Sequence, residues 1–184
     1  MSALWQSVLV RAAALAGLAL LVAPVRAQAD DLIDEALRSA ARTFERAAGR
    51  LDAASMGVSK AEYGDALTRG RFASTLWGAN LDVRVASNDS ERGLCAGFAA
   101  YVTPAIEQGA VVLTICPRFL LPGADALRET TVLHEMVHVV AGPDECRAMA
   151  YTAQIQVLAT GTFQPVRDYW MKNNCEASRY RLPG

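Results

Sequence analysis

Histidine, excess basic charge and aromatic residues are all scarce in this sequence. The 184 residues include only two histidines, aromatic side chains make up 7%, and 18 Lys and Arg face 19 Asp and Glu. Surfaces that bind nucleic acid need clustered basic residues, often with aromatic side chains among them, and the basic residues here are scattered. We therefore expect no nucleic-acid partner.

Long apolar runs are also missing, except near the N-terminus. Residues 12–23 are mostly Ala, Leu and Val, and Pro24 and a small-x-small pattern, Val25-Arg26-Ala27, follow. About a dozen apolar residues are too few for a membrane span, which needs about 20, but they are typical of a secretory signal peptide. We predict a signal peptide over residues 1–27, with Ala29 as an alternative cleavage position and an uncleaved anchor as the competing interpretation. The mature chain, 28–184, would be a single exported domain, periplasmic or secreted, without stable membrane insertion.

No CxxC pair occurs among the four cysteines, which disfavours a cysteine-zinc site. An even number of cysteines in an oxidising compartment indicates two disulfides. A predicted strand pair over 96–102 and 110–115, joined by a turn over 103–109, would place positions whose numbers sum to about 211 opposite each other. Cys95 and Cys116 meet that condition.

The other two cysteines fit a second hairpin in the C-terminal part. Predicted helices over 143–159 and 165–174 flank a turn at 160–162. In an antiparallel pair about that turn, positions whose numbers sum to about 321 come together, as Cys146 and Cys175 do. We therefore predict the disulfides Cys95–Cys116 and Cys146–Cys175.

The periodicity of apolar residues predicts an α+β protein. Spacings of three and four indicate helices near both ends of the mature chain, and β-branched or alternating segments between them indicate a small, mostly antiparallel sheet. Asp30 and Asp31 favour the start of the first helix, and Ser59 with Glu62 forms a capping-box pattern at the second. The expected helices cover residues 30–54, 60–68, 125–140, 143–159 and 165–174, and the expected strands cover 81–85, 96–102 and 110–115.

Both histidines lie in one five-residue segment, His134-Glu135-Met136-Val137-His138, which is an HExxH motif on a predicted helix. Positions four residues apart lie on the same helix face, so the two imidazoles can bind one Zn²⁺. Glu135 would then reach a zinc-bound water and act as its general base. The competing interpretation, an accidental motif in the core, would bury two imidazoles and a carboxylate without metal, which is costly.

A catalytic zinc site needs a third protein ligand, and the sequence has no third histidine. Asp144 and Glu145 follow the Gly142-Pro143 break at the end of the motif helix, and either could fold back over it. We predict Glu145, because its longer side chain tolerates a looser approach. Asp144 is the alternative third ligand.

Hydrolysis of an amide also calls for a hydrogen-bond donor to the oxyanion. Tyr151, about two helical turns after Glu145, is the candidate donor, with a core aromatic as the competing interpretation. Tyr101 is a weaker candidate, on a strand that could hold an extended peptide. Arg118 could steer an acidic or C-terminal group, although a solvated arginine is the default expectation. The aromatic residues expected in the core are Trp77, Trp170 and Phe119.

Residues 111–151 resemble part of the zincin metallopeptidases. An apolar strand that ends in ICPRF at 115–119, shortly before the HEMVH helix, is similar to the corresponding segment of deuterolysin-like and lysine-specific metallo-endopeptidases, the aspzincins. The resemblance implies a zincin-like fold and an endopeptidase in which His134 and His138 bind zinc and Glu135 is the base.

The segment after the motif departs from the aspzincin pattern. Aspzincins take their third ligand from the aspartate of a GTxD motif, whereas this chain has a glutamate at that place, in GPDE at 142–145. A glutamate there is similar to small gluzincins. Asp144 falls at the third-ligand position of the metzincin pattern, but Ala141 replaces the glycine of that pattern.

The function expected from these residues is zinc-dependent hydrolysis of peptide bonds in a peptide or protein substrate, with one Zn²⁺ per chain. Two alternatives stay open. One is an exported zinc-binding module without catalysis, and the other is a zinc hydrolase that acts on a non-peptide amide.

Overall fold

The computed structural model describes residues 27–184. Residues 1–26, and with them the predicted signal peptide, lie outside the described part. The chain forms two compact units, one that ends at Glu35 and one over Ala36–Gly184. In the first unit, residues 27–35 are helical, so Asp30 lies within a helix rather than at the start predicted for it.

In the second unit the N-terminal helix ends earlier than predicted, at residue 48 instead of about 54. The Arg50 N–H donates to the Ala47 carbonyl at 2.8 Å and tightens the last turn. Lys60 Nζ donates to the carbonyl oxygens of Ala48 and Leu51 at 3.2 and 2.9 Å. A lysine from the next helix thus satisfies carbonyls that are freed at the helix end, which the local apolar pattern does not reveal.

A short ribbon leads into the second helix. Ser59 is the N-cap residue, and its Oγ accepts the Glu62 N–H at 3.3 Å, as the capping-box pattern predicts. A capping box would also have the Glu62 carboxylate accept the Ser59 N–H. That part of the prediction is wrong, because the carboxylate accepts from the N–H and hydroxyl of Thr75, at 3.2 and 2.9 Å. The elements are β1 (Ala54–Ser55), β2 (Val58–Ser59) and α2 (Lys60–Arg69).

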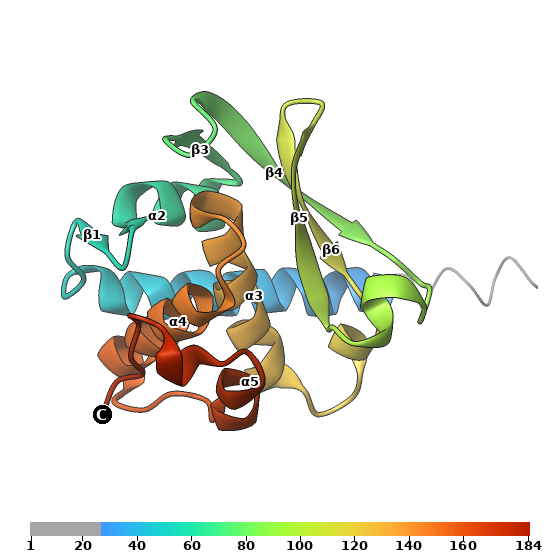
Figure 1. The fold of residues 1–184 in the computed structure, drawn as a ribbon. Coiled ribbons are helices and arrows are strands. Elements are labelled where there is room, and N and C mark those ends of the chain that lie inside the picture. The colour runs from blue at the N-terminus through green and yellow to red at the C-terminus, as the bar shows by residue number, and fades with distance from the viewer. Residues whose placement is uncertain (1–26) are drawn as a thin grey trace, which may run out of the picture. The chain divides into compact units, whose positions relative to one another are not determined.

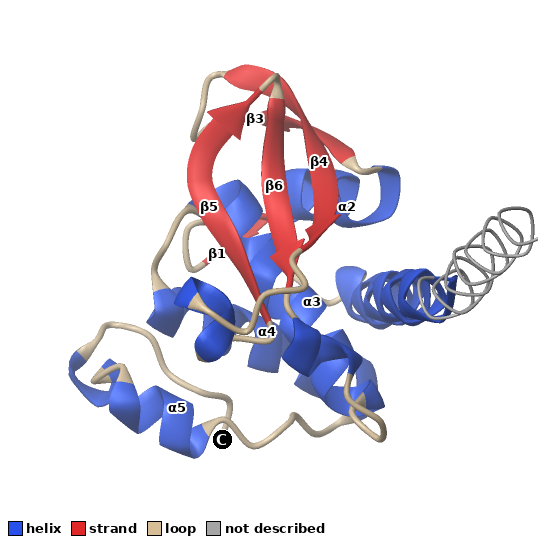
Figure 2. Ribbon diagram, turned by 90° about the vertical axis from the view of Figure 1, so that its right-hand side faces the viewer, coloured by secondary structure: helices blue, strands red, loops and turns tan. Residues whose placement is uncertain are grey.

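The four-stranded sheet has the order β3-β4-β6-β5 (Figure 2). The β4–β6 pair is parallel and the other two pairs are antiparallel, so the sheet is mostly antiparallel, as expected. Within this sheet, β3 is the strand that the sequence did not predict, because four residues give too short an alternation to recognise. The strands are β3 (Arg71–Ser74), β4 (Ala79–Ser87), β5 (Ala100–Glu107) and β6 (Ala110–Ile115).

The hairpin between β5 and β6 differs from the prediction. Its turn is Gln108-Gly109, with φ of 52° and 78°, rather than a loop over 103–109. Two positive φ values in a two-residue turn match the right-handed twist of the strands. The register pairs Tyr101 with Thr114, four positions away from the register predicted, and the 3₁₀ helix η1 (Gly93–Ala96) replaces the start of the predicted strand over 96–102.

Helix α3 (Asp125–Ala141) carries the HExxH motif and packs against α2, α4, β5 and β6 (Figure 1). It holds no glycine or proline, and its buried apolar residues recur at spacings of three and four. The buried Arg128 donates to the carbonyl oxygens of Phe119 and Leu121, at 3.2 and 2.8 Å, and so attaches the 3₁₀ helix η2 (Pro117–Leu120) to α3. The motif helix is therefore held by packing against four elements and by the hydrogen bonds of Arg128 to the segment before it.

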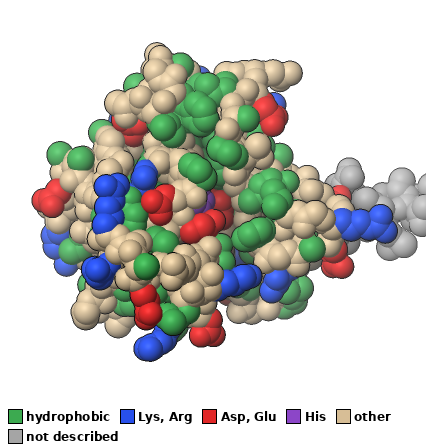
Figure 3. All heavy atoms as spheres, viewed as in Figure 1, with side chains coloured by type: hydrophobic (Ala, Val, Ile, Leu, Met, Phe, Trp, Pro, Cys, Tyr) green, Lys and Arg blue, Asp and Glu red, His purple; other side chains and the backbone are tan. Residues whose placement is uncertain are grey.

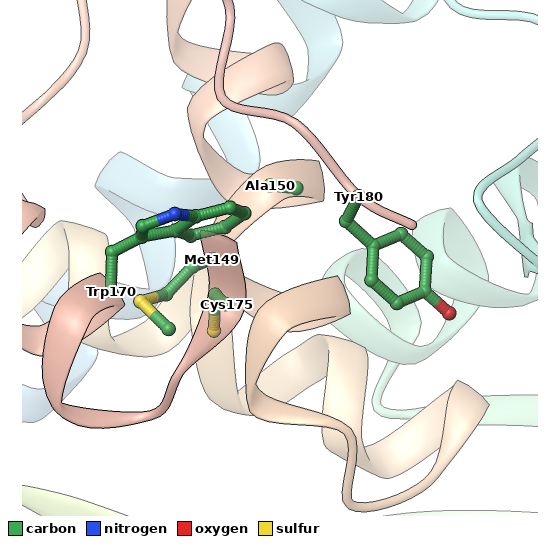
Figure 4. Close-up of a cluster of buried hydrophobic side chains, with 5 residues drawn as sticks. All are labelled: Met149, Ala150, Trp170, Cys175 and Tyr180. Atoms are coloured by element: carbon green, nitrogen blue, oxygen red, sulfur yellow. The ribbon is translucent and has the colours of Figure 1, made fainter. Parts of the chain in front are cut away.

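The C-terminal part comprises α4 (Glu145–Thr160), α5 (Arg167–Lys172) and the 3₁₀ helix η3 (Cys175–Ala177). Both helices are shorter at their starts than predicted, and α5 ends at Lys172 rather than at 174. A cluster of buried residues holds this part together, and Figure 4 shows the Trp170 ring beside the Met149 side chain. The cluster consists of Met149, Ala150, Trp170, Cys175 and Tyr180.

The architecture is a mixed α+β fold, as the sequence predicted. Within residues 27–184, the helices all fall short of the length and apolar character that a membrane span requires.

Candidate metal centre

Three side chains from two helices converge at the end of α3. The Nε2 atoms of His134 and His138 are 3.1 Å apart. Oε2 of Glu145 lies 3.0 Å from Nε2 of His134 and 3.7 Å from Nε2 of His138. Zinc–ligand bonds of about 2.0–2.2 Å in a tetrahedron imply ligand atoms about 3.3 to 3.6 Å apart, and the three observed separations bracket that range. The cluster could hold a metal ion.

The backbone of the turn after α3 orients the second histidine. Nδ1 of His138 lies 3.0 Å from the Gly142 carbonyl oxygen. A neutral imidazole that donates its Nδ1 proton there presents the lone pair of Nε2 to His134 and Glu145. Gly142 reaches this position with φ 86° and ψ −175°, a conformation open essentially to glycine alone.

The two adjacent acids have different contacts. Asp144 is the N-cap of α4, and its Oδ1 accepts the Arg147 N–H at 3.0 Å. Glu145, in the first turn of α4, points its carboxylate at the histidines, and its side chain is 33% exposed. The structure therefore brings the predicted ligand Glu145 to the cluster, while the alternative ligand, Asp144, caps a helix.

Charge coupling between these groups is strong. Partial burial opposes ionisation of Glu145, but its hydrogen bonds with His134 and His138 outweigh that effect and hold its pKa well below the usual range. Burial lowers the pKa of His134. Burial alone would also lower the pKa of His138, but the hydrogen bond with Glu145 and the nearby Glu135 raise it overall. A negative carboxylate beside two imidazoles is the electrostatic setting of a cation site.

Glu135 is buried beside the cluster without being one of its three members. Desolvation raises the pKa of Glu135 to about 8, although the positive character of His138 and a hydrogen bond from the Val102 backbone oppose the shift. Val102 belongs to β5, so the sheet edge and the motif helix together enclose this carboxylate. A partly desolvated carboxylate next to a cation site can act as a proton acceptor and donor.

The tyrosine that lies at the His134–His138–Glu145 cluster is not the one proposed from the sequence. The predicted oxyanion donor Tyr151 is fully buried, and its ring packs edge-on against Tyr63 at 5.3 Å. This burial matches the competing interpretation of Tyr151, a core aromatic. Tyr169 of α5 donates to Oε2 of Glu145 at 3.2 Å, and its ring lies 6.2 Å from that of His134. No local pattern marked Tyr169, since α5 joins the site only through tertiary packing.

Arg118, Phe119 and Trp170 match their default interpretations, whereas Trp77, which was expected in the core, is not fully buried. Arg118 is exposed and donates to the Gly97 carbonyl at 3.1 Å, while Phe119 and Trp170 are buried. Tyr101 is partly buried on β5. Trp77 is partly buried, and its Nε1 is enclosed without a hydrogen-bond partner among the described residues.

Both predicted cysteine pairs are present as disulfides, although the predicted registers do not explain them. Cys95 lies in η1, before β5, and η1 folds it back to reach Cys116. Cys175 lies in η3, beyond α5, and bonds to Cys146, the neighbour of Glu145. Two disulfides are typical of proteins from an oxidising, exported environment.

Comparisons of the chain with protein-family models, curated proteins and solved structures give no match. The chemistry of the site therefore has to be inferred from its own residues.

Proposed function

We propose that this protein is an exported, zinc-dependent metallopeptidase with a zincin-like active site. The observation that carries the proposal is the convergence of His134, His138 and Glu145, with the separate carboxylate of Glu135 buried next to them. Three ligands plus one independent carboxylate are what a hydrolytic zinc site requires.

The donor set favours zinc over other cations. Calcium and magnesium prefer six or more oxygen ligands, whereas two imidazole nitrogens and one carboxylate oxygen suit a first-row transition metal. The tetrahedral spacing of the three donor atoms favours zinc among these metals. Zinc held there would lower the pKa of a coordinated water toward neutrality and polarise a substrate carbonyl.

The protein's own residues supply the proton transfers. Glu135 would take the proton from the attacking water and pass it to the leaving amine, so that the buried carboxylate acts first as base and then as acid. Tyr169, whose hydroxyl already lies 3.2 Å from Glu145, would donate a hydrogen bond to the oxyanion. Burial raises the pKa of Tyr169, which keeps this donor protonated.

An extended polypeptide is the substrate that the neighbouring sheet favours. β5 is at the edge of the four-stranded sheet and packs against α3, and the Val102 backbone lies at Glu135. The pairing of β5 with β6 is interrupted between Val102 and Ile106, next to Glu135. An edge strand beside the catalytic carboxylate can bind an extended chain through backbone hydrogen bonds.

The test replaces the carboxylate that acts as base. The Glu135→Gln variant should bind one equivalent of zinc, as measured by metal analysis, and cleave casein or a mixed peptide library slower by on the order of 10² to 10⁴. Chelation should abolish wild-type cleavage, and added zinc should restore it.

Two results would count against the proposal in different ways. A wild-type protein that binds zinc but cleaves no peptide would be a zinc-binding module or a hydrolase of another amide. Cleavage of cell-wall peptides would indicate the hydrolase, and no cleavage of them would indicate the binding module. Equal cleavage by wild type and Glu135→Gln would exclude the proposed role of the carboxylate.

A further inference from the structure

A cavity of about 580 Å³ opens beside the candidate centre and has His134 and Glu135 at one end. Its floor is one face of α3, where Thr131 lies about one turn before His134, and Leu127 lies another turn closer to the helix start, at the rim. Seven residues of helix span about 10 Å, so the cavity leads away from the motif along α3 for roughly that distance. Its volume is in the range of sites that enclose a small ligand or a side chain.

The walls of this cavity are apolar. Ala100 and Met149 lie buried at its inner surface, while Phe98, Leu121 and Leu127 are 37%, 56% and 56% exposed at its rim. Three large exposed hydrophobic residues, which come from three different segments, thus converge on one opening. In Figure 3, hydrophobic side chains gather on the surface to one side of the visible histidine.

Charges at the cavity do not favour a charged occupant. Arg118, Arg167 and Asp168 line it, are exposed and carry both signs. The hydroxyl of Thr130 is already used, because it donates to the Ala126 carbonyl at 2.8 Å and accepts from Gln156 at 2.9 Å. Away from the end formed by His134 and Glu135, a Lys or Glu side chain placed inside would lose hydration without gaining a buried charged partner among the lining residues.

We infer that this cavity receives a large apolar side chain, Leu, Met or Phe, of the polypeptide substrate, next to the bond that is cleaved. The inference rests on the proposed function, because it takes the end marked by His134 and Glu135 as the place of reaction. It names Leu127 and Thr131 as residues that determine specificity. Leu127 provides apolar contact at the rim, and Thr131 sets the free space on the floor.

The experiment separates binding from cleavage by using two sets of probes. Peptide libraries with Leu, Phe, Ala, Lys or Glu at one position report kcat/KM. Short peptide hydroxamates with the same side chains report Kd on the zinc-loaded protein, whether or not it cleaves peptides. Compared with Lys and Glu probes, we expect Leu and Phe probes to give a kcat/KM about tenfold or more higher and a Kd about tenfold or more lower, the size of effect that one or two buried methylene groups produce.

Three variants test the named residues. Leu127→Asp should lower kcat/KM for Leu substrates about tenfold, mainly through KM, and weaken the Leu hydroxamate by a similar factor. Thr131→Phe should shift the preference from Leu and Phe to Ala by filling the cavity. Leu94→Asp is the matched control, because Leu94 is 54% exposed but does not line the cavity, and it should change both measurements less than twofold.

Each outcome bears on one proposal. Cleavage without an apolar preference, or an unchanged preference in both Leu127→Asp and Thr131→Phe, would overturn the inference and leave the peptidase intact. Absent cleavage with a retained preference among the hydroxamates would overturn the peptidase and support the cavity. Zinc content and circular dichroism of each variant show whether it folds.

Discussion

At the scale of single residues, two pairs of side chains with similar chemistry make different contacts. Asp144 accepts the Arg147 N–H and caps α4, whereas the carboxylate of Glu145 is turned toward two imidazoles. Likewise the hydroxyl of Tyr169 contacts Glu145, whereas that of Tyr151 is buried without a hydrogen-bond partner among the described residues. These contrasts allow matched substitutions.

The first prediction compares the two acids. Glu145→Ala should weaken zinc binding on the order of 100-fold or more, since even outer partners of zinc ligands contribute 10- to 100-fold. Asp144→Ala should keep the zinc affinity within a few-fold and lower the free energy of unfolding by about 1 kcal/mol, because it removes a helix cap. Zinc competition titration and urea denaturation measure the two effects. Loss of zinc in Asp144→Ala alone would exchange the roles.

The second prediction compares the two tyrosines. Tyr169→Phe should retain zinc and lower kcat on the order of 100-fold, because it removes a donor to the oxyanion. Tyr151→Phe should leave kcat unchanged and keep or slightly raise the free energy of unfolding, because the buried hydroxyl that it removes is unpaired. Steady-state kinetics and denaturation check both. A larger loss of activity in Tyr151→Phe than in Tyr169→Phe would reverse the assignment.

At the scale of elements, the site depends on the short turn between α3 and α4. Gly142 accepts the Nδ1 proton of His138 on its carbonyl and adopts φ 86° with ψ −175°. Glu145 starts the next helix only three residues later. The same turn therefore orients one proposed ligand, His138, and positions another, Glu145.

The third prediction substitutes this glycine. In Gly142→Ala the new Cβ would lie 3.7 Å from Leu76, an ordinary contact, so the cost is backbone strain of about 1 to 3 kcal/mol. The zinc affinity should fall as well, because the carbonyl that orients His138 moves. Gly161→Ala is the control, since Gly161 has the same φ of 86° at the end of α4, away from the histidines.

The control should lose about 1 kcal/mol of stability and keep its zinc affinity. Zinc titration of both variants, beside thermal denaturation, makes the comparison. Equal zinc affinity in the two would show that the Gly142 carbonyl does not orient His138.

At the scale of the whole molecule, two disulfides close loops of similar length but different importance to the site. Cys95–Cys116 spans 21 residues and Cys146–Cys175 spans 29, for which loop-closure entropy predicts stabilisation of about 3 to 4 kcal/mol each. Only the second disulfide attaches the helix that begins with Glu145 to the segment that follows α5. Helix α5 itself carries Tyr169.

The fourth prediction follows from this difference. Replacing Cys146 and Cys175 with serine should weaken zinc binding by tenfold or more, since the ligand helix and α5 lose their covalent link, an effect on the order of that of outer ligand partners. Replacing Cys95 and Cys116 should lower stability similarly and leave zinc affinity within a few-fold. Zinc affinity well below the unfolding temperature distinguishes the two pairs. Equal loss in both would mean that only global stability matters.

The predictions from sequence that proved wrong concern features that local patterns do not encode. The early end of the N-terminal helix, the tight Gln108-Gly109 turn and the use of Glu62 by Thr75 all depend on partners distant in sequence or on strand twist. Periodicity and capping patterns report only local preferences. The cysteine pairs were nevertheless right, because η1 and η3 compensate for the incorrect registers.

The sequence by itself determined the helix that carries His134, Glu135 and His138, because helical spacing places residues four apart on one face. It also narrowed the candidates for a third ligand to two acids, because it contains no other histidine. Only the tertiary structure brought Glu145 rather than Asp144 to the histidines, placed Tyr169 beside them and assembled the apolar cavity from segments that are distant in the sequence. Such convergence depends on packing between elements, whose distances no local pattern encodes.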